Sequence, residues 1–239
     1  TKLFYMIEET DFETFLYIST NKYQIIIFDK KKLKNLYSDE LIVCNELNFQ
    51  DLKDLSKFLD DNIYKIEKLV GHFIKDIILI IENDNNLYVN ISIKKKDYNN
   101  SINHKYLESN LTELKDLYKE NYQQENVMHM LIISCTINGQ KYSSFKENST
   151  GNNLCLEVNF ISISNELASK LSKVLEKYQV KINQYMCGNY VKKFLDHDHS
   201  EFYLTAHKLK NGHNDNEVIL VPKNIENMGF FEKFFQLFS

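Results

Sequence analysis

The residues best suited to chemistry lie in a short turn between two apolar segments. The stretch YISTNKYQIIIFD (17–29) places Ser19, Thr20 and Lys22 in or beside this turn. Hairpins of this shape bind nucleotide phosphates in some enzymes. Such binding needs close approach of the backbone, which glycine permits because it lacks a Cβ atom, and a carboxylate that supports the metal and the attacking water. Tyr17 and Ser19 supply neither, so we expect a degenerate, structural hairpin and no bound cofactor.

A second polar cluster, DHDHSE (196–201), places His197 and His199 two residues apart among acids. Two histidines on one strand face can bind zinc or nickel, with a third ligand from His207 or His213. The spacing matches no strong ligand motif such as H-E-x-x-H. A polar loop is the favoured interpretation, and we expect no metal site.

The remaining candidates for catalysis are isolated residues. Ser143, Ser144 and Ser200 lack the G-x-S-x-G context of a hydrolase nucleophile, and neither a P-loop nor G-x-G-x-x-G occurs. His129 lies beside apolar residues and is interpreted as a structural histidine with a hydrogen-bond partner. We therefore expect no enzymatic activity.

Charge and composition narrow the possible partners and compartment. The 239-residue chain has a net charge of −4, so no global basic field indicates nucleic-acid binding. No apolar run approaches the ~18 residues of a spanning helix, and the first residues do not resemble a secretory signal. Four widely spaced cysteines without a C-x-x-C motif indicate buried free thiols in a reducing compartment: Cys44, Cys135, Cys155 and Cys187.

The elements that must position these residues follow from hydrophobic periodicity. Helices are predicted over 50–70, 110–122, 165–178, 189–195 and 201–209, with Asn48 as a cap and Gly71 as a stop for the first. Strands are predicted over 14–20, 23–29, 39–46, 73–83, 87–93, 128–137, 154–164, 180–187 and 217–222. This alternation predicts an α/β fold that tends to α+β.

The stretch 128–187 resembles the inserted subdomain of the bacterial cell-division protein FtsA. In that family a histidine precedes a strand, and a glycine-containing pattern, a strand, a helix and a further strand follow. The matching positions occur in that order at His129, Gly139, Gln140, Gly151, Leu154, Glu157 and Val158. The segment 39–82 resembles the helix and strand that lead into this insert.

The same resemblance makes 14–29 the first phosphate hairpin of the family. Thr20 and Lys22 match the pattern, whereas Tyr17 and Ser19 replace its Asp and Gly. The second, glycine-rich phosphate turn is absent after residue 190, and the resemblance implies that the other half of the body is missing.

The resemblance implies a reduced actin-like, ribonuclease H-like mixed sheet with an inserted α+β subdomain. The expected divisions are an actin-like subdomain over 1–97, the inserted subdomain over 98–190, a remnant and connector over 191–227, and an amphipathic helix over 228–239.

The final segment, GFFEKFFQLF (229–238), carries an apolar stripe at helical spacing. Such a helix lies in the bilayer interface, and the resemblance implies the same, because a membrane-targeting helix closes FtsA. Docking of the helix onto the protein's own core is the alternative. The proposed membrane-binding residues are Phe230, Phe231, Phe234, Phe235 and Phe238.

The function implied is a non-enzymatic adaptor in cell division, located in the cytoplasm against the inner face of the membrane at the septum. The implied partners are later septal proteins, FtsZ and a second copy of the chain. Two alternatives remain open: an actin-like ATPase with an unrecognised nucleotide site, and an adaptor in pilus or secretion assembly that binds a partner peptide at an exposed strand edge.

Overall fold

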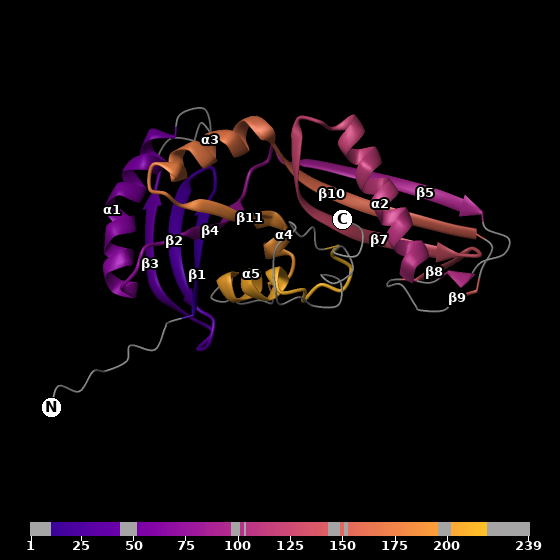
Figure 1. Cartoon of the computed structure of the whole chain (residues 1–239), viewed down its shortest axis with the longest axis horizontal. Coiled ribbons are helices and arrows are strands. Elements are labelled where there is room, and N and C mark those ends of the chain that lie inside the picture. Colours follow the sequence, from indigo (N-terminus) through magenta and orange to yellow (C-terminus); the bar gives the residue numbers. More distant parts are fainter. Residues whose placement is uncertain are drawn as a thin grey trace. The chain divides into compact units, whose positions relative to one another are not determined.

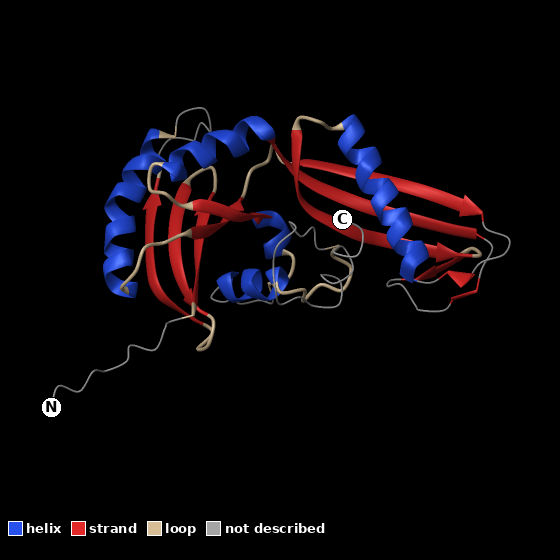
Figure 2. Cartoon of the chain, viewed as in Figure 1, coloured by secondary structure: helices blue, strands red, loops and turns tan. Residues whose placement is uncertain are grey.

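The structure is a computed structural model. It describes residues 11–43, 52–96, 101–102, 104–142, 149–150, 153–195 and 202–218. The described residues form two compact units. The first unit takes its described residues from Thr1–Asp84 and Leu167–His207, and the second from Asn85–Glu166 and Lys208–Ser239. Two main sheets with helices confirm the predicted α/β to α+β fold class (Figure 2).

The first unit contains a five-stranded mixed sheet in the order β11-β4-β1-β2-β3 (Figure 1). Strands β1 and β2 form the predicted antiparallel hairpin, and β3 continues it. Strands β4 and β11 run parallel to β1. The strands are β1 (Phe12–Ile18), β2 (Lys22–Asp29), β3 (Lys34–Ile42), β4 (Asp76–Ile81) and β11 (Lys181–Cys187).

Helices cover both faces of this sheet, which explains the nearly continuous apolar runs of β1, β2 and β4. On one face the ring of Tyr23 stacks on Phe58 of α1 at 6.1 Å. On the other face the ring of Phe15 meets Tyr203 of α5 at 5.7 Å. The helices of this unit are α1 (Lys53–Val70), α3 (Asn165–Glu176, from Leu167 onward), α4 (Gly188–Lys192) and α5 (Phe202–Lys210).

Helix α1 shows how the sequence pattern produces the packing. Leu55, Leu59, Ile63 and Ile66 recur at three and four residues and are all buried. Gly71 ends the helix with φ +83°, and its N–H donates to the Glu67 carbonyl at 2.8 Å. The predicted cap, Asn48, lies outside the described residues.

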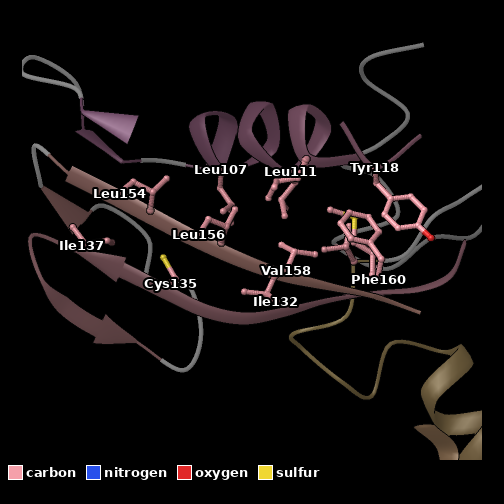
Figure 3. Close-up of a cluster of buried hydrophobic side chains, with 13 residues drawn as sticks. Leu107, Leu111, Tyr118, Ile132, Cys135, Ile137, Leu154, Leu156, Val158 and Phe160 are labelled. Atoms are coloured by element: carbon pink, nitrogen blue, oxygen red, sulfur yellow. The ribbon is translucent and has the colours of Figure 1, made fainter. Parts of the chain in front are cut away.

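The second unit contains a four-stranded antiparallel sheet in the order β5-β10-β7-β8, and α2 covers one of its faces. The stripe of α2 buries Leu107, Leu111 and Leu114 in one core with residues of β10 and β7. Figure 3 shows Leu107 and Leu111 pointing from α2 toward these strands. The elements are β5 (Leu87–Lys96), β6 (Ser101–Ile102), α2 (His104–Asn121), β7 (Glu125–Ile137), β8 (Gln140–Tyr142), β9 (Ser149–Thr150) and β10 (Asn153–Ser164). Strands β6 and β9 form a small separate pair.

Tyr118 fixes one end of this core. Its ring stacks on Phe160 at 4.4 Å, and its hydroxyl lies 2.6 Å from the Ser162 hydroxyl. Both polar groups are buried, so each depends on the other as a hydrogen-bond partner.

Several predicted boundaries differ from the structure. Strand β5, which the expected actin-like subdomain over 1–97 included, pairs with β10 and belongs to the second unit. Its alternating burial identifies a strand with only one covered face. Helix α2 begins at His104, earlier than the predicted range of 110–122. Asn110 lies within the helix and donates to the Tyr106 carbonyl at 2.5 Å. Strand β3 begins at Lys34 and ends at Ile42, earlier than predicted.

The two units also divide the chain differently from the expected ranges of 1–97 and 98–190. The first change of unit falls at Asp84, before β5. Strand β11 lies in the first unit, where it pairs with β4. Segments 196–201 and 219–239, with most of the expected connector and all of the amphipathic tail, lie outside the described residues.

Candidate functional site

The predicted hairpin lies at the end of the sheet where the carboxyl ends of three parallel strands meet. Strands β1, β4 and β11 finish at Ile18, Ile81 and Cys187, and the β1–β2 turn follows at the same edge. In mixed sheets, side chains beyond the carboxyl ends of parallel strands commonly build the functional site. Here the Tyr17 hydroxyl and the Glu82 carboxylate meet at these strand ends.

Tyr17 and Glu82 form a closed polar network with Lys192 of α4. The Tyr17 hydroxyl donates to Glu82 Oε2, and the Lys192 ammonium lies 2.6 Å from the same oxygen. Burial and the neighbouring Glu82 carboxylate raise the pKa of Tyr17 above its usual range. The hydroxyl therefore stays protonated at neutral pH and acts as a donor, not as a nucleophile.

An aromatic ring and an ammonium group contact the Tyr17 side chain. The ring of Phe202 meets it edge-on at 5.6 Å, and the Lys22 ammonium lies 5.5 Å from its centroid. These residues line a pocket of about 350 Å³ on the α5 side of the sheet. The full lining is Tyr17, Lys22, Gln24, Asn35, Lys192, Leu195, Phe202 and Tyr203.

The turn itself uses its polar groups internally. The Ser19 N–H donates to the Lys22 carbonyl at 2.9 Å, and the Ser19 hydroxyl donates to Asn21 Oδ1 at 3.0 Å. Ser19 is buried, whereas Thr20 is exposed. The Lys22 ammonium also lies 3.5 Å from Glu40 of β3. The four predicted hairpin residues are thus brought to one place, with Ser19 and Lys22 in contacts within the protein.

Gly188 contributes space rather than chemistry. A Cβ atom at this position would lie 3.0 Å from the Glu82 Cβ and 3.4 Å from its backbone. Glycine at the start of α4 therefore lets β11 approach the end of β4.

The other candidate residues from the sequence have structural partners or lie outside the described residues. His129 is buried, and its Nδ1 lies 2.6 Å from Glu217 Oε1, which confirms the predicted structural histidine. His207 lies 2.7 Å from Glu13. Within the part of the chain that the structure describes, no group of three metal-ligating residues occurs. Outside it lie His197, His199, Ser143, Ser144, Ser200, Cys44, Gly151 and the five tail phenylalanines.

Sequence reasoning missed Glu82, Lys192, Gly188 and the aromatic residues of α5. One signal was available: Glu82 is the charged residue near the end of the apolar run 73–83, which forms β4 over Asp76–Ile81. In a parallel sheet the carboxyl ends of neighbouring strands lie together, so a charged residue at one strand end is close to residues at the ends of the adjacent strands. Lys192 and Phe202 gave no comparable signal, because their positions depend on the packing of α4 and α5.

No protein-family model matches the chain, and a search of curated proteins finds no match. Solved structures with similar architecture include the cytoplasmic domain of EpsL, an inner membrane component of the type II secretion system of Vibrio cholerae. It has 8% identity and a TM-score of 0.37, and the match covers 75% of this chain and 58% of that one. A PilM–PilN type IV pilus biogenesis complex matches with 9% identity and a TM-score of 0.45, over 75% and 48%.

A Bacteroides thetaiotaomicron protein of unknown function, described as having an actin-like ATPase fold, matches with 14% identity and a TM-score of 0.32, over 78% and 56%. This chain therefore spans about half the length of the solved structures it matches. Similarity at this level concerns the fold alone. None of the three matches reported is described as a cell-division protein.

Among the described residues, no helix is both long and apolar enough to cross a membrane.

Proposed function

We propose that this chain is a non-catalytic adaptor that uses an actin-like sheet as a scaffold for binding other proteins. The observation that carries the proposal is the network of Tyr17, Glu82 and Lys192. It lies at the strand ends where the resemblance places a nucleotide phosphate.

Nucleotide binding at this edge would have to break that network. The Glu82 carboxylate already holds the Lys192 ammonium and the Tyr17 hydroxyl, so neither its charge nor that of Lys192 is available to a metal or a phosphate. A pocket of about 440 Å³ lies beside the turn, and Tyr17 lines it at the position where the family pattern has a carboxylate. Breaking this pair would separate Glu82 from Lys192 and from Tyr17, and water would recover part of the loss because the two charged side chains are partly exposed.

Of the two settings considered for the adaptor, we place assembly of the pilus or secretion kind first. Such an adaptor needs an exposed strand edge for a partner peptide. Strands β3 and β5 are terminal in the sheet orders of their respective units. A role at the division septum is the second candidate, and peripheral membrane contact through residues 229–238 belongs to both.

Two experiments test the proposal. Equilibrium binding of a fluorescent ATP analogue with Mg²⁺, together with thermal unfolding in the presence of Mg²⁺-ATP, should show no saturable binding and no shift in Tm. A dissociation constant below about 100 μM at 1 mM ATP would raise stability by about 1.4 kcal/mol and would overturn the non-catalytic assignment.

Liposome co-sedimentation tests the membrane contact. We expect the intact chain to pellet with lipid and the Phe231→Asp, Phe234→Asp variant to remain in the supernatant. If neither pellets and the variant unfolds at a lower temperature, the tail belongs to the core and the membrane role fails.

A further inference from the structure

Strand β3 forms one edge of the sheet in the first unit, and α1 lies beside it (Figure 1). The Tyr37 hydroxyl of β3 donates to Asn62 of α1 at 2.6 Å, which joins the two elements at one end. Beyond this contact a groove of about 470 Å³ separates them. Its lining from β3 and the residue that follows is Asp39, Glu40, Leu41, Ile42 and Val43, and from α1 it is Asp54, Lys57, Phe58, Asp61, Asn62 and Lys65.

The register of β3 shows which backbone groups face this edge. The Val43 N–H donates to the Asn21 carbonyl at 2.8 Å, beside the Lys22↔Ile42 pair. In an antiparallel ladder, residues alternate between bonding to the partner strand and bonding away from it. Leu41 and Asp39 therefore bond toward β2, whereas Ile42, Glu40 and Ser38 direct their N–H and C=O groups outward.

One outward backbone group of β3 is bonded to a side chain of the same strand. The Glu40 N–H, which faces the open edge, donates to the Asp39 carboxylate at 2.9 Å. A side-chain oxygen thus takes the place that a partner carbonyl would occupy. The irregularity of the β2–β3 ladder lies farther back, between Ile27 and Phe28, which leaves 38–42 in regular register.

The charges of the groove select the chemistry of the strand that fits it. Four carboxylates and two ammonium groups line it, and Leu41 and Phe58 provide an apolar floor. The groove residues of α1 recur at three and four positions, so they form one face of the helix. A strand entering here meets the edge of β3 on one side and two carboxylates and two ammonium groups of α1 on the other. Asp39 and Glu40 of β3 give the groove as a whole its excess of two carboxylates.

We propose that this groove binds an extended basic peptide segment of a partner protein, which adds a sixth strand at the β3 edge. Five edge residues at about 3.3 Å each allow a contact of about 16 Å. Main-chain hydrogen bonds to Ser38, Glu40 and Ile42 provide affinity, and lysine or arginine side chains opposite Asp54 and Asp61 provide specificity. The inference rests on the proposed adaptor function and names the class of its partner.

Fluorescence anisotropy with a labelled hexapeptide of alternating lysine and valine tests this inference on the full chain. The Asp54→Lys, Asp61→Lys variant should bind the probe at least tenfold more weakly. Both positions are exposed, so the fold should persist. The matched control, Asp116→Lys, Glu120→Lys, makes the same charge change on exposed positions of α2 and should bind as the original chain does.

Backbone pairing needs its own test, because charge alone would also attract the probe. Hydrogen exchange should slow at Ser38, Glu40 and Ile42 when the probe binds, and remain unchanged at Asp39 and Leu41. Glu40→Pro removes one outward N–H without removing a bond to β2, so it should abolish binding with little change in Tm. Equal binding by an alternating glutamate–valine peptide, or equal weakening in both charge variants, would overturn the proposal.

The ATP experiment separates this inference from the proposed function. A chain that binds neither ATP nor the basic peptide remains an adaptor with a different binding surface, and the inference is refuted. A chain that binds ATP refutes the adaptor assignment whatever the peptide does.

Discussion

Replacing Tyr17 by Phe removes one hydroxyl and leaves the ring against Phe202. The lost interaction is a hydrogen bond to the Glu82 carboxylate, a class that contributes about 1.5–3 kcal/mol. Glu82 keeps Lys192 at 2.6 Å and its side chain is 25% exposed, so water recovers part of the loss. We expect about 1–2 kcal/mol, which corresponds to a fall in Tm of about 2–8 °C for a chain of this size.

The same substitution changes the response of stability to alkaline pH. The pKa of Tyr17 is raised in the folded state, so the folded protein retains the hydroxyl proton where the unfolded chain, with a pKa near 10, loses it. The stabilisation is fully present below about pH 10 and is lost as pH rises toward the folded-state value. Tyr17→Phe should therefore unfold with a shallower dependence on pH above about 10.

Urea unfolding followed by circular dichroism at pH 7 and between pH 9.5 and 11 measures both effects. Tyr64→Phe is the matched control, because Tyr64 is 72% exposed on α1 and should change neither quantity. Equal stability of Tyr17→Phe and the original chain at pH 7, with the same alkaline slope, would refute the closed network as a stabilising element.

Three further substitutions or modifications test other parts of the structure. Gly188→Ala should destabilise the first unit by about 1–3 kcal/mol, measured by urea unfolding, because the added methyl group would meet Glu82 at 3.0 Å; unchanged stability would show that this strand end can move. Leu114→Ala should cost about 2–5 kcal/mol in the same assay, because Leu114 is fully buried in the α2 core, whereas a cost below 1 kcal/mol would contradict that packing. Burial raises the pKa of the Cys135 thiol to about 11, so a disulfide reagent at pH 8 should label it only after denaturation, and rapid labelling in the folded protein would contradict its burial.

The apolar pattern predicted the main strands and helices of both units, because a buried strand or helix face requires apolar residues at regular spacing. The Ile-rich run of β4, the hairpin and the stripe of α1 all lie where their periodicity placed them. The same periodicity cannot state which strand a given strand pairs with. Strand β5 was assigned to the sheet of its predecessor β4, yet it pairs with β10, more than 50 residues later.

The candidate site was predictable only in its local part. The hairpin residues are consecutive, so Tyr17, Ser19 and Lys22 had to lie together. Glu82 contacts Tyr17 across 65 positions of sequence, and Lys192 contacts Glu82 across 110, because β4 runs parallel to β1 and α4 follows β11 at the same end of the sheet. A pattern within a short window carries no information about such contacts.

The closed network and the open strand edge belong to the same sheet and suit the same role. At the end of β1, Tyr17 stands where nucleotide chemistry would need a carboxylate, and the Glu82 carboxylate is paired with Tyr17 and Lys192. Glu82 is partly exposed, and its hydrogen bond to Tyr17 and its ion pair with Lys192 stabilise the charge at this end of the sheet. At the far side of the sheet, β3 keeps outward backbone groups beside an acidic groove instead of covering them within the described residues. The proposed adaptor role fits this arrangement, because the polar groups at the strand ends are paired within the protein and the lateral strand β3 can add a partner strand.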